Sequence, residues 1–374
     1  MNLLFDLTAS QPNNKIKRHG GGKYCEILLD SLCKREVSFQ AFYNSSKYLN
    51  PQVYENLKQY DIKLHDIKDK PLQSIVKQNN INTIYSALPE ALLPWPTCKI
   101  LGTIHGLRSL ELESDFYGHW LLDSGLIGIN TVLGLFFHRI NKKKIFNHYQ
   151  NLLQTSNFSF VTVSNHSKKV IQAVCPNLDI PVFYPPSTSI YHSEKKSNEK
   201  YFLIVSADRF EKNCTRAIIA IDKLFSKKKI PSDVFVKITG ITHNISRYNI
   251  KNISNFKFLG YVDDEELDSL YANSYAFIYP SLNEGFGYPP LEAMKYKVPV
   301  IASNAASIPE VCGNAALYFN PTSISELETR IVKLQDKHVY SDLQKKGRIR
   351  FQEIETKQKE DLDKLVDWII RNST

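Results

Sequence analysis

The second half of the chain alternates short apolar runs with stretches of helical periodicity. Apolar runs occupy residues 200–207, 233–240, 255–262, 275–282 and 298–303, and "ALYFNP" ends the series. Helical stretches lie between them, and in "DDEELDSLYANS" Asp263 and Glu266 form a capping box. Apolar strands that alternate with helices favour a parallel sheet covered by helices on both faces.

The first half repeats this alternation more weakly. "MNLLFDL", "INTIYSAL", "KILGTIHG" and "FSFVTVSN" are typical of strands, and residues 184–199 have the Pro, Ser and charge content of a linker. The chain is therefore predicted to be α/β, with two Rossmann-like doubly wound domains at 1–190 and 191–350 and a C-terminal helix at 351–374. In such folds ligands bind beyond the C-terminal ends of the strands.

Composition is that of a soluble globular protein: among 374 residues, 43% are hydrophobic and 23% charged. The net charge of +9 indicates either an anionic partner (nucleotide phosphates, lipid head groups or nucleic acid) or simply a solubilising surface. None of the six cysteines forms a C-x-x-C pair. No apolar run reaches 18 residues, and the first residues lack a secretory pattern. We therefore expect a cytoplasmic chain with reduced thiols.

The stretch "SLNEGFGYPPLEAM" at 281–294 carries the first candidate chemistry. It is not a dinucleotide fingerprint, because Pro290 stands at the third glycine position. Glu284 ends a predicted strand, and Glu292 is expected in the first turn of the next helix, where the helix N-terminus stabilises an anion. Three interpretations of this stretch remain open: a site that binds sugar hydroxyls, a carboxylate pair for glycoside hydrolysis, or a tight turn.

Two further stretches follow predicted strands. In "DRFEKN", Arg209 and Lys212 are three residues apart and can point to one side, which matches a diphosphate; a pair of solvated surface charges is the alternative. In "RHGGGKY", Gly21 and Gly22 lie between the first strand and a helical stretch. They would form either a loop that binds phosphate or a flexible turn. His105 in "TIHG" also follows a strand, and both a structural and a catalytic role remain open.

No metal cofactor is expected from the sequence. No His or Cys cluster has the spacing of metal ligands. The one D-x-D pattern, Asp361 to Asp363, lies on the charged C-terminal helix, where it is interpreted as a solvated face.

Residues 258–321, "FLGYVDDEELDSLYANSYAFIYPSLNEGFGYPPLEAMKYKVPVIASNAASIPEVCGNAALYFNP", closely resemble the signature region of family 4 glycosyltransferases, which are retaining enzymes of GT-B fold. Seven residues separate Glu284 from Glu292, as in the family's E-x7-E motif. "RFEKN" resembles its basic phosphate motif, and the glycine loop, "TIHG" and "VTVSNHS" follow in the family's order. The chain departs from the family at Gly106, where an Asp is usual, and at Lys297, where glycine is common.

The resemblance implies a role for each candidate residue. The C-terminal domain would bind a nucleotide-sugar donor, and Arg209 and Lys212 would stabilise the leaving diphosphate in place of a metal. Glu292 would hold the ribose, and Glu284 the donor sugar. Gly21 and Gly22 would approach the diphosphate, His105 would contact the sugar, and the C-terminal helix would cross back onto the first domain. The further donor-binding residues would be Gly285, Phe286, Gly287 and Tyr288.

The function implied is retaining, metal-independent transfer of a hexose or deoxyhexose in cell-surface polysaccharide synthesis. GDP-mannose, dTDP-rhamnose and a UDP-sugar remain open as donors, with a glycan or lipid-linked glycan as acceptor, bound mainly by the first domain. Residues 136–150 combine aromatic with basic side chains and would suit an anionic membrane surface. The alternatives are a glycoside hydrolase that uses Glu284 and Glu292, and a non-enzymatic sugar- or nucleic-acid-binding protein; no nucleic-acid module is recognisable.

Overall fold

The computed structural model describes residues 2–12, 20–93, 97–112, 129–187, 199–243 and 249–373. For residues 129–140 it describes the backbone alone. The chain forms two compact units. The first comprises residues 1–107, 146–188 and 355–374, and the second comprises 108–145 and 189–354. The middle of the predicted linker, 188–198, lies outside the described residues.

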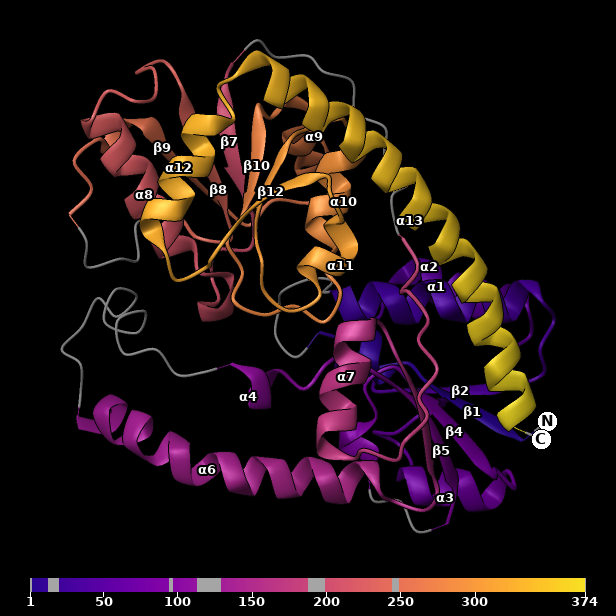
Figure 1. Cartoon of the computed structure of the whole chain (residues 1–374). Helices are drawn as coiled ribbons and strands as arrows, with labels where there is room; N and C mark the ends of the chain where they lie inside the picture. Colours follow the sequence, from indigo (N-terminus) through magenta and orange to yellow (C-terminus); the bar gives the residue numbers. More distant parts are fainter. Residues whose placement is uncertain are drawn as a thin grey trace. The chain divides into compact units, whose positions relative to one another are not determined.

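The first unit is built on a six-stranded parallel sheet (Figure 1). Its strand order, β3-β2-β1-β4-β5-β6, is that of the Rossmann fold. The strands are β1 Leu3–Asp6, β2 Gln40–Tyr43, β3 Leu64–Asp66, β4 Thr83–Ser86, β5 Lys99–Ile104 and β6 Phe158–Thr162. Four of these were predicted, but β2 and β3 were not, because they are short and partly exposed and carry no continuous apolar run.

Helices follow the strands of this unit. They are η1 Thr8–Ser10, α1 Gly20–Lys34, α2 Pro51–Gln59, α3 Leu72–Gln78, η2 Pro89–Leu92 and α7 Asn165–Val174. One expectation needs correction: Gly21 and Gly22 belong to the first turn of α1 rather than to a loop before it. Their backbone N–H groups therefore belong to the first turn of a helix.

The second unit repeats the same topology. Its parallel sheet has the order β12-β11-β10-β7-β8-β9, again the Rossmann arrangement (Figure 1). The strands are β7 Tyr201–Ile204, β8 Phe235–Thr239, β9 Phe256–Gly260, β10 Ala276–Tyr279, β11 Val300–Ser303 and β12 Ala316–Phe319. All six lie within the apolar runs that predicted them, because the central strands are buried on both faces.

The helices of the second unit are α4 Arg108–Glu111, η3 Phe210–Lys212, α8 Cys214–Ser226, η4 Ile253–Asn255, α9 Asp264–Asn273, α10 Tyr288–Lys295, α11 Ile308–Cys312 and α12 Ile324–Lys333. The predicted cap is present: the Asp263 carboxylate accepts a hydrogen bond from the Glu266 N–H at 2.8 Å. Glu292 was expected in the first turn of α10 but is its fifth residue, because the helix already begins at Tyr288, with Gly287 as its N-cap.

Two helices extend across the division between the units: α6 Ile129–Leu153 and α13 Lys337–Asn372. The end of α13 packs into the apolar core of the first unit through Leu365, Val366 and Ile369. The interpretation of Asp361 as part of a solvated face was wrong. Its carboxylate is buried, accepts a hydrogen bond from the Tyr184 N–H at 2.9 Å and pairs with Lys357. The helix therefore crosses back, as the resemblance implied.

Candidate functional site

The candidate residues of the second unit gather where its strand order reverses. In this sheet β7 and β10 are neighbours, and the chain leaves them in opposite lateral directions, which is the usual ligand position in doubly wound sheets. Arg209 and Lys212 lie in the loop after β7, and Glu284 lies in the loop after β10. The fold thus brings together residues that are 72 positions apart in sequence.

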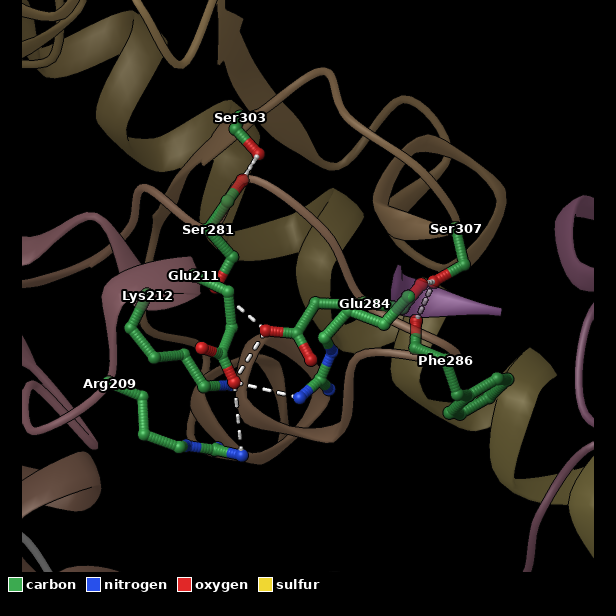
Figure 2. A network of polar contacts seen from close by, with 9 residues as sticks. Arg209, Glu211, Lys212, Ser281, Glu284, Phe286, Ser303 and Ser307 are labelled. Atoms are coloured by element: carbon green, nitrogen blue, oxygen red, sulfur yellow. Dashed lines mark hydrogen bonds and ion pairs between the residues drawn. The ribbon is translucent and has the colours of Figure 1, made fainter. Parts of the chain in front are cut away.

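Lys212 and Glu284 form a buried ion pair. The Lys212 Nζ lies 2.6 Å from Glu284 Oε1, and the two side chains are 7% and 10% exposed. The Ser281 hydroxyl donates to the same oxygen at 2.7 Å (Figure 2). Burial raises the pKa of Glu284, but the Lys212 charge and the hydrogen bonds outweigh it and hold this pKa below its ordinary value. Glu284 is therefore a carboxylate at neutral pH.

Arg209 lies in the same turn but has another partner. Its guanidinium is about half exposed and lies 3.4 Å from Glu211 Oε1, which also accepts a hydrogen bond from Arg108 of α4 at 2.7 Å. The Glu211 carbonyl accepts from the Leu282 N–H at 2.7 Å, which joins this turn to the loop of Glu284. Lys212 is thus fixed and buried, whereas Arg209 is held at the surface.

Both loops are held in place by hydrogen bonds to backbone carbonyls. Asn213 has a left-handed backbone, with φ of 54°, and its Nδ2 donates to the Pro280 and Pro321 carbonyls at 2.9 and 2.7 Å. The Ser307 hydroxyl lies 2.9 Å from the carbonyl of Glu284 and 2.6 Å from that of Phe286. These contacts fix the path of the chain on both sides of the ion pair.

The backbone between the two glutamates turns at Gly287. Its φ of 107° is open to glycine and strained for other residues, so a glycine is needed at position 287 for the turn that starts α10. The region after it includes Tyr288 and the two prolines that begin the helix. Glu292 is half-buried on α10, and its charge acts on the Tyr271 hydroxyl of α9.

The remaining predicted residues belong to the first unit. Gly21 and Gly22 lie at the start of α1. His105 directly follows β5, as predicted, and its Nε2 donates to the Ala87 carbonyl at 3.1 Å, which requires the proton on that nitrogen. The His105 ring packs edge-on against Tyr24, with ring centroids 4.9 Å apart. Gly106, where the family has Asp, has a φ of 134°, which favours glycine.

Sequence reasoning missed several partners of this site. Glu211 stands between the two predicted cations, and its position in "RFEK" was a usable signal. Arg108 gave none, since its partner is 103 residues away. Ser281 and Ser307 gave none either, because serines are common in loops.

Among the described residues, no group of three or more His, Cys, Asp or Glu side chains is placed to hold a metal ion. In the same part of the chain, every helix is too short or too polar to cross a bilayer.

Comparison with known proteins gives matches to glycosyltransferases. Residues 188–350 match the family model "Glycosyl transferases group 1". O-antigen chain mannosyltransferase B of Escherichia coli is 49% identical over 81 residues, which are 21% of this chain and 21% of that protein. O-antigen chain mannosyltransferase RfbU of Salmonella typhimurium is 32% identical over 163 residues, 42% of this chain and 44% of that protein. The matched part thus spans less than half the length of either relative.

Solved structures match over nearly the whole chain. A glycosyltransferase from Rickettsia africae superposes with a TM-score of 0.63 at 17% identity, covering 99% of this chain and 98% of that one. HepE from Anabaena in complex with UDP-glucose gives a TM-score of 0.60 at 15% identity, covering 98% and 99%. The fold of the chain is therefore GT-B.

Proposed function

We propose that this chain is a glycosyltransferase that moves a mannosyl group from a nucleotide-diphosphate sugar onto a growing O-antigen type of glycan. The observation that carries the proposal is the buried pair of Lys212 and Glu284, with Arg209 in the same turn, at the strand-order reversal of the domain that matches group 1. The names of the relatives support mannosyl transfer, and the structure of HepE with UDP-glucose supports a nucleotide sugar as donor.

The cations would act on the departing diphosphate. In the proposed reaction the acceptor hydroxyl attacks the anomeric carbon, and the bond from that carbon to the β-phosphate oxygen breaks. The acceptor proton passes to a departing phosphate oxygen on the same face, so configuration is retained. Lys212, whose charge is buried, and Arg209, which is more exposed, would stabilise the negative charge that develops on the diphosphate, without a metal.

The two glutamates would hold the two ends of the donor. Glu284, which is ionised and is held by Lys212 and Ser281 in the free protein, would accept hydrogen bonds from sugar hydroxyls. The backbone N–H groups of Phe286, Gly287 and Tyr288 would also hold the sugar. Glu292, farther along α10, would accept from the ribose. His105, Gly21 and Gly22 would contribute from the first unit, whose main task would be to bind the acceptor.

A nucleotide-sugar panel tests the proposal. GDP-mannose, dTDP-rhamnose and UDP-glucose are each added to the chain, and thermal stabilisation and release of nucleoside diphosphate are measured. We expect GDP-mannose to give the largest response. Absence of stabilisation by every nucleotide sugar would refute the transferase function, and release of free mannose from glycosides without any nucleotide would favour the hydrolase alternative.

Three further measurements separate the finer parts of the proposal. Activity that disappears with EDTA and returns with a divalent ion would contradict metal independence. Proton NMR of the product determines its anomeric configuration, and an inverted product would contradict the retaining course. Glu292→Ala should weaken binding of the nucleoside diphosphate more than Glu284→Ala does, and the reverse order would mean that their roles are exchanged.

We also propose contact with an anionic membrane through α6. Lys143, Lys144 and Phe146 of this helix are exposed, whereas the Arg139 side chain lies outside the described residues. The test is sedimentation with anionic liposomes. A variant with Lys142, Lys143 and Lys144 replaced by Gln should bind less, and equal sedimentation of variant and wild type would contradict membrane contact through these lysines.

A further inference from the structure

Two arginines of α13 hold the C-terminal ends of two helices in the second unit. Arg350 reaches α11, where its Nε donates to the Val311 carbonyl at 2.8 Å and its Nη2 donates to the Glu310 carbonyl at 2.7 Å. Arg348 reaches α10, where its Nη1 donates at 2.9 Å to the carbonyl of Lys295, the last residue of that helix. The last carbonyls of a helix lack partners within the helix, and a cation beside them complements the helix dipole. Each arginine therefore holds one helix end.

α13 approaches both helices closely at these points. A Cβ at Gly347 would lie 3.3 Å from Met294 Cγ of α10, which is closer than ordinary van der Waals contact. At α11 the C-cap is Gly313, with a left-handed φ of 55°, and a Cβ there would lie 3.2 Å from Arg350 Nε. The Arg350 side chain is only 23% exposed, and its Nη1 pairs with Glu353 at 2.9 Å. The guanidinium is thus held on several sides while it binds the carbonyls of α11.

The other ends of α10 and α11 lie at the proposed donor-binding loop, residues 284–288. α10 begins at Tyr288 in this loop and carries Glu292. α11 directly follows Ser307, whose hydroxyl lies 2.9 Å from the carbonyl of Glu284 and 2.6 Å from that of Phe286 (Figure 2). With eight and five residues, the two helices are only about 12 and 8 Å long. Helices this short and regular transmit a fixed position from one end to the other.

We propose that Arg348 and Arg350 are positioning residues for the donor-binding loop, because they fix the far ends of the two helices that support it. The inference rests on the proposed function. Arg350 acts through α11 and Ser307 on the sugar end of the donor, and Arg348 acts through α10 on Glu292 at the ribose end. Without these contacts the donor itself would have to order the loop, and that ordering would be subtracted from the binding free energy.

Arg→Met variants test this, because Met keeps a long side chain but donates no hydrogen bond. Affinity for GDP and GDP-mannose is measured by titration calorimetry at a temperature where each variant is folded. Arg350→Met should lower GDP-mannose affinity about five- to tenfold with little change for GDP, whereas Arg348→Met should lower both. Arg350→Lys keeps the charge without the fork of donors, so its GDP-mannose affinity should lie between wild type and Arg350→Met. It also serves as the test variant if Arg350→Met does not fold.

Tyr340 supplies a matched control from the same helix. Its hydroxyl donates at 3.0 Å to the carbonyl of Tyr275, which directly precedes β10 and so lies at the opposite end of that strand from Glu284. Tyr340→Phe should therefore melt lower and bind both nucleotides as wild type does. The proposal is overturned if the arginine variants melt lower but bind as wild type does, or if Tyr340→Phe loses affinity as they do. A wild type that binds neither GDP nor GDP-mannose would instead refute the proposed function.

Discussion

Replacing one member of the Lys212–Glu284 pair is expected to destabilise the second unit strongly. At 2.6 Å and an effective dielectric constant of about 20, the attraction of the two charges is about 6 kcal/mol, offset by the cost of removing both from water. Glu284→Gln keeps the shape but leaves a buried ammonium without its counter-charge. We expect a loss of about 3–5 kcal/mol, which lowers the melting temperature by roughly 6–20 °C in a unit of this size.

A double-mutant cycle isolates the pair from its surroundings. Lys212→Met should cost as much as Glu284→Gln, whereas the double variant should cost much less than the sum, because neither charge remains buried alone. The assay is thermal unfolding followed by calorimetry at neutral pH. The strong coupling of the pair would be refuted if each single variant lost less than about 1 kcal/mol of unfolding free energy. It would also be refuted if the two losses simply added in the double variant.

Acid titration gives the same pair a second signature. The folded-state pKa of Glu284 is depressed below its unfolded value near 4.5, so its contribution is present above that pH and is lost as pH falls through the lower folded value. Wild type should therefore lose this part of its stability below about pH 4.5. In Lys212→Met, burial becomes the dominant influence on the pKa of Glu284. The stability of this variant should therefore approach that of wild type as the pH falls.

Three further predictions concern single positions. Lys297 has a left-handed φ of 58°, so Lys297→Gly should stabilise by about 1 kcal/mol in thermal melts, and Lys297→Ala, the matched control, should not. Asn213→Ala removes two hydrogen bonds to backbone carbonyls and strains the backbone, so it should lower the free energy of unfolding by about 3 kcal/mol. Asn213→Gly suits the same φ and should cost less, and equal losses would contradict a role for the backbone conformation. Asp361→Ala should cost about 1–3 kcal/mol, because the buried Tyr184 N–H loses its acceptor, and a neutral result would contradict that role.

The sequence predicted the second unit better than the first for a physical reason. Its central strands are buried on both faces and appear as continuous apolar runs, whereas β2 and β3 lie towards one edge, are short, and mix exposed with buried positions. The positions of Arg209, Lys212 and Glu284 after strands were predictable from the fold class. Which carboxylate each cation pairs with was not predictable, because Lys212 binds a residue 72 positions away.

The charges of this site explain why an acid stands between its two cations. Arg108, Arg209 and Lys212 face Glu211 and Glu284, three positive charges against two negative ones. Without Glu211, two guanidinium groups and an ammonium would have one carboxylate among them, and their repulsion would open the turn after β7. With it, the arginine at the surface is oriented while the lysine is held by Glu284. In the proposed reaction a diphosphate would compete with both carboxylates for these cations, and Glu284, released from Lys212, would be free to accept sugar hydroxyls. The pairing in the free protein thus keeps the cations in place and leaves the exchange of partners to the donor.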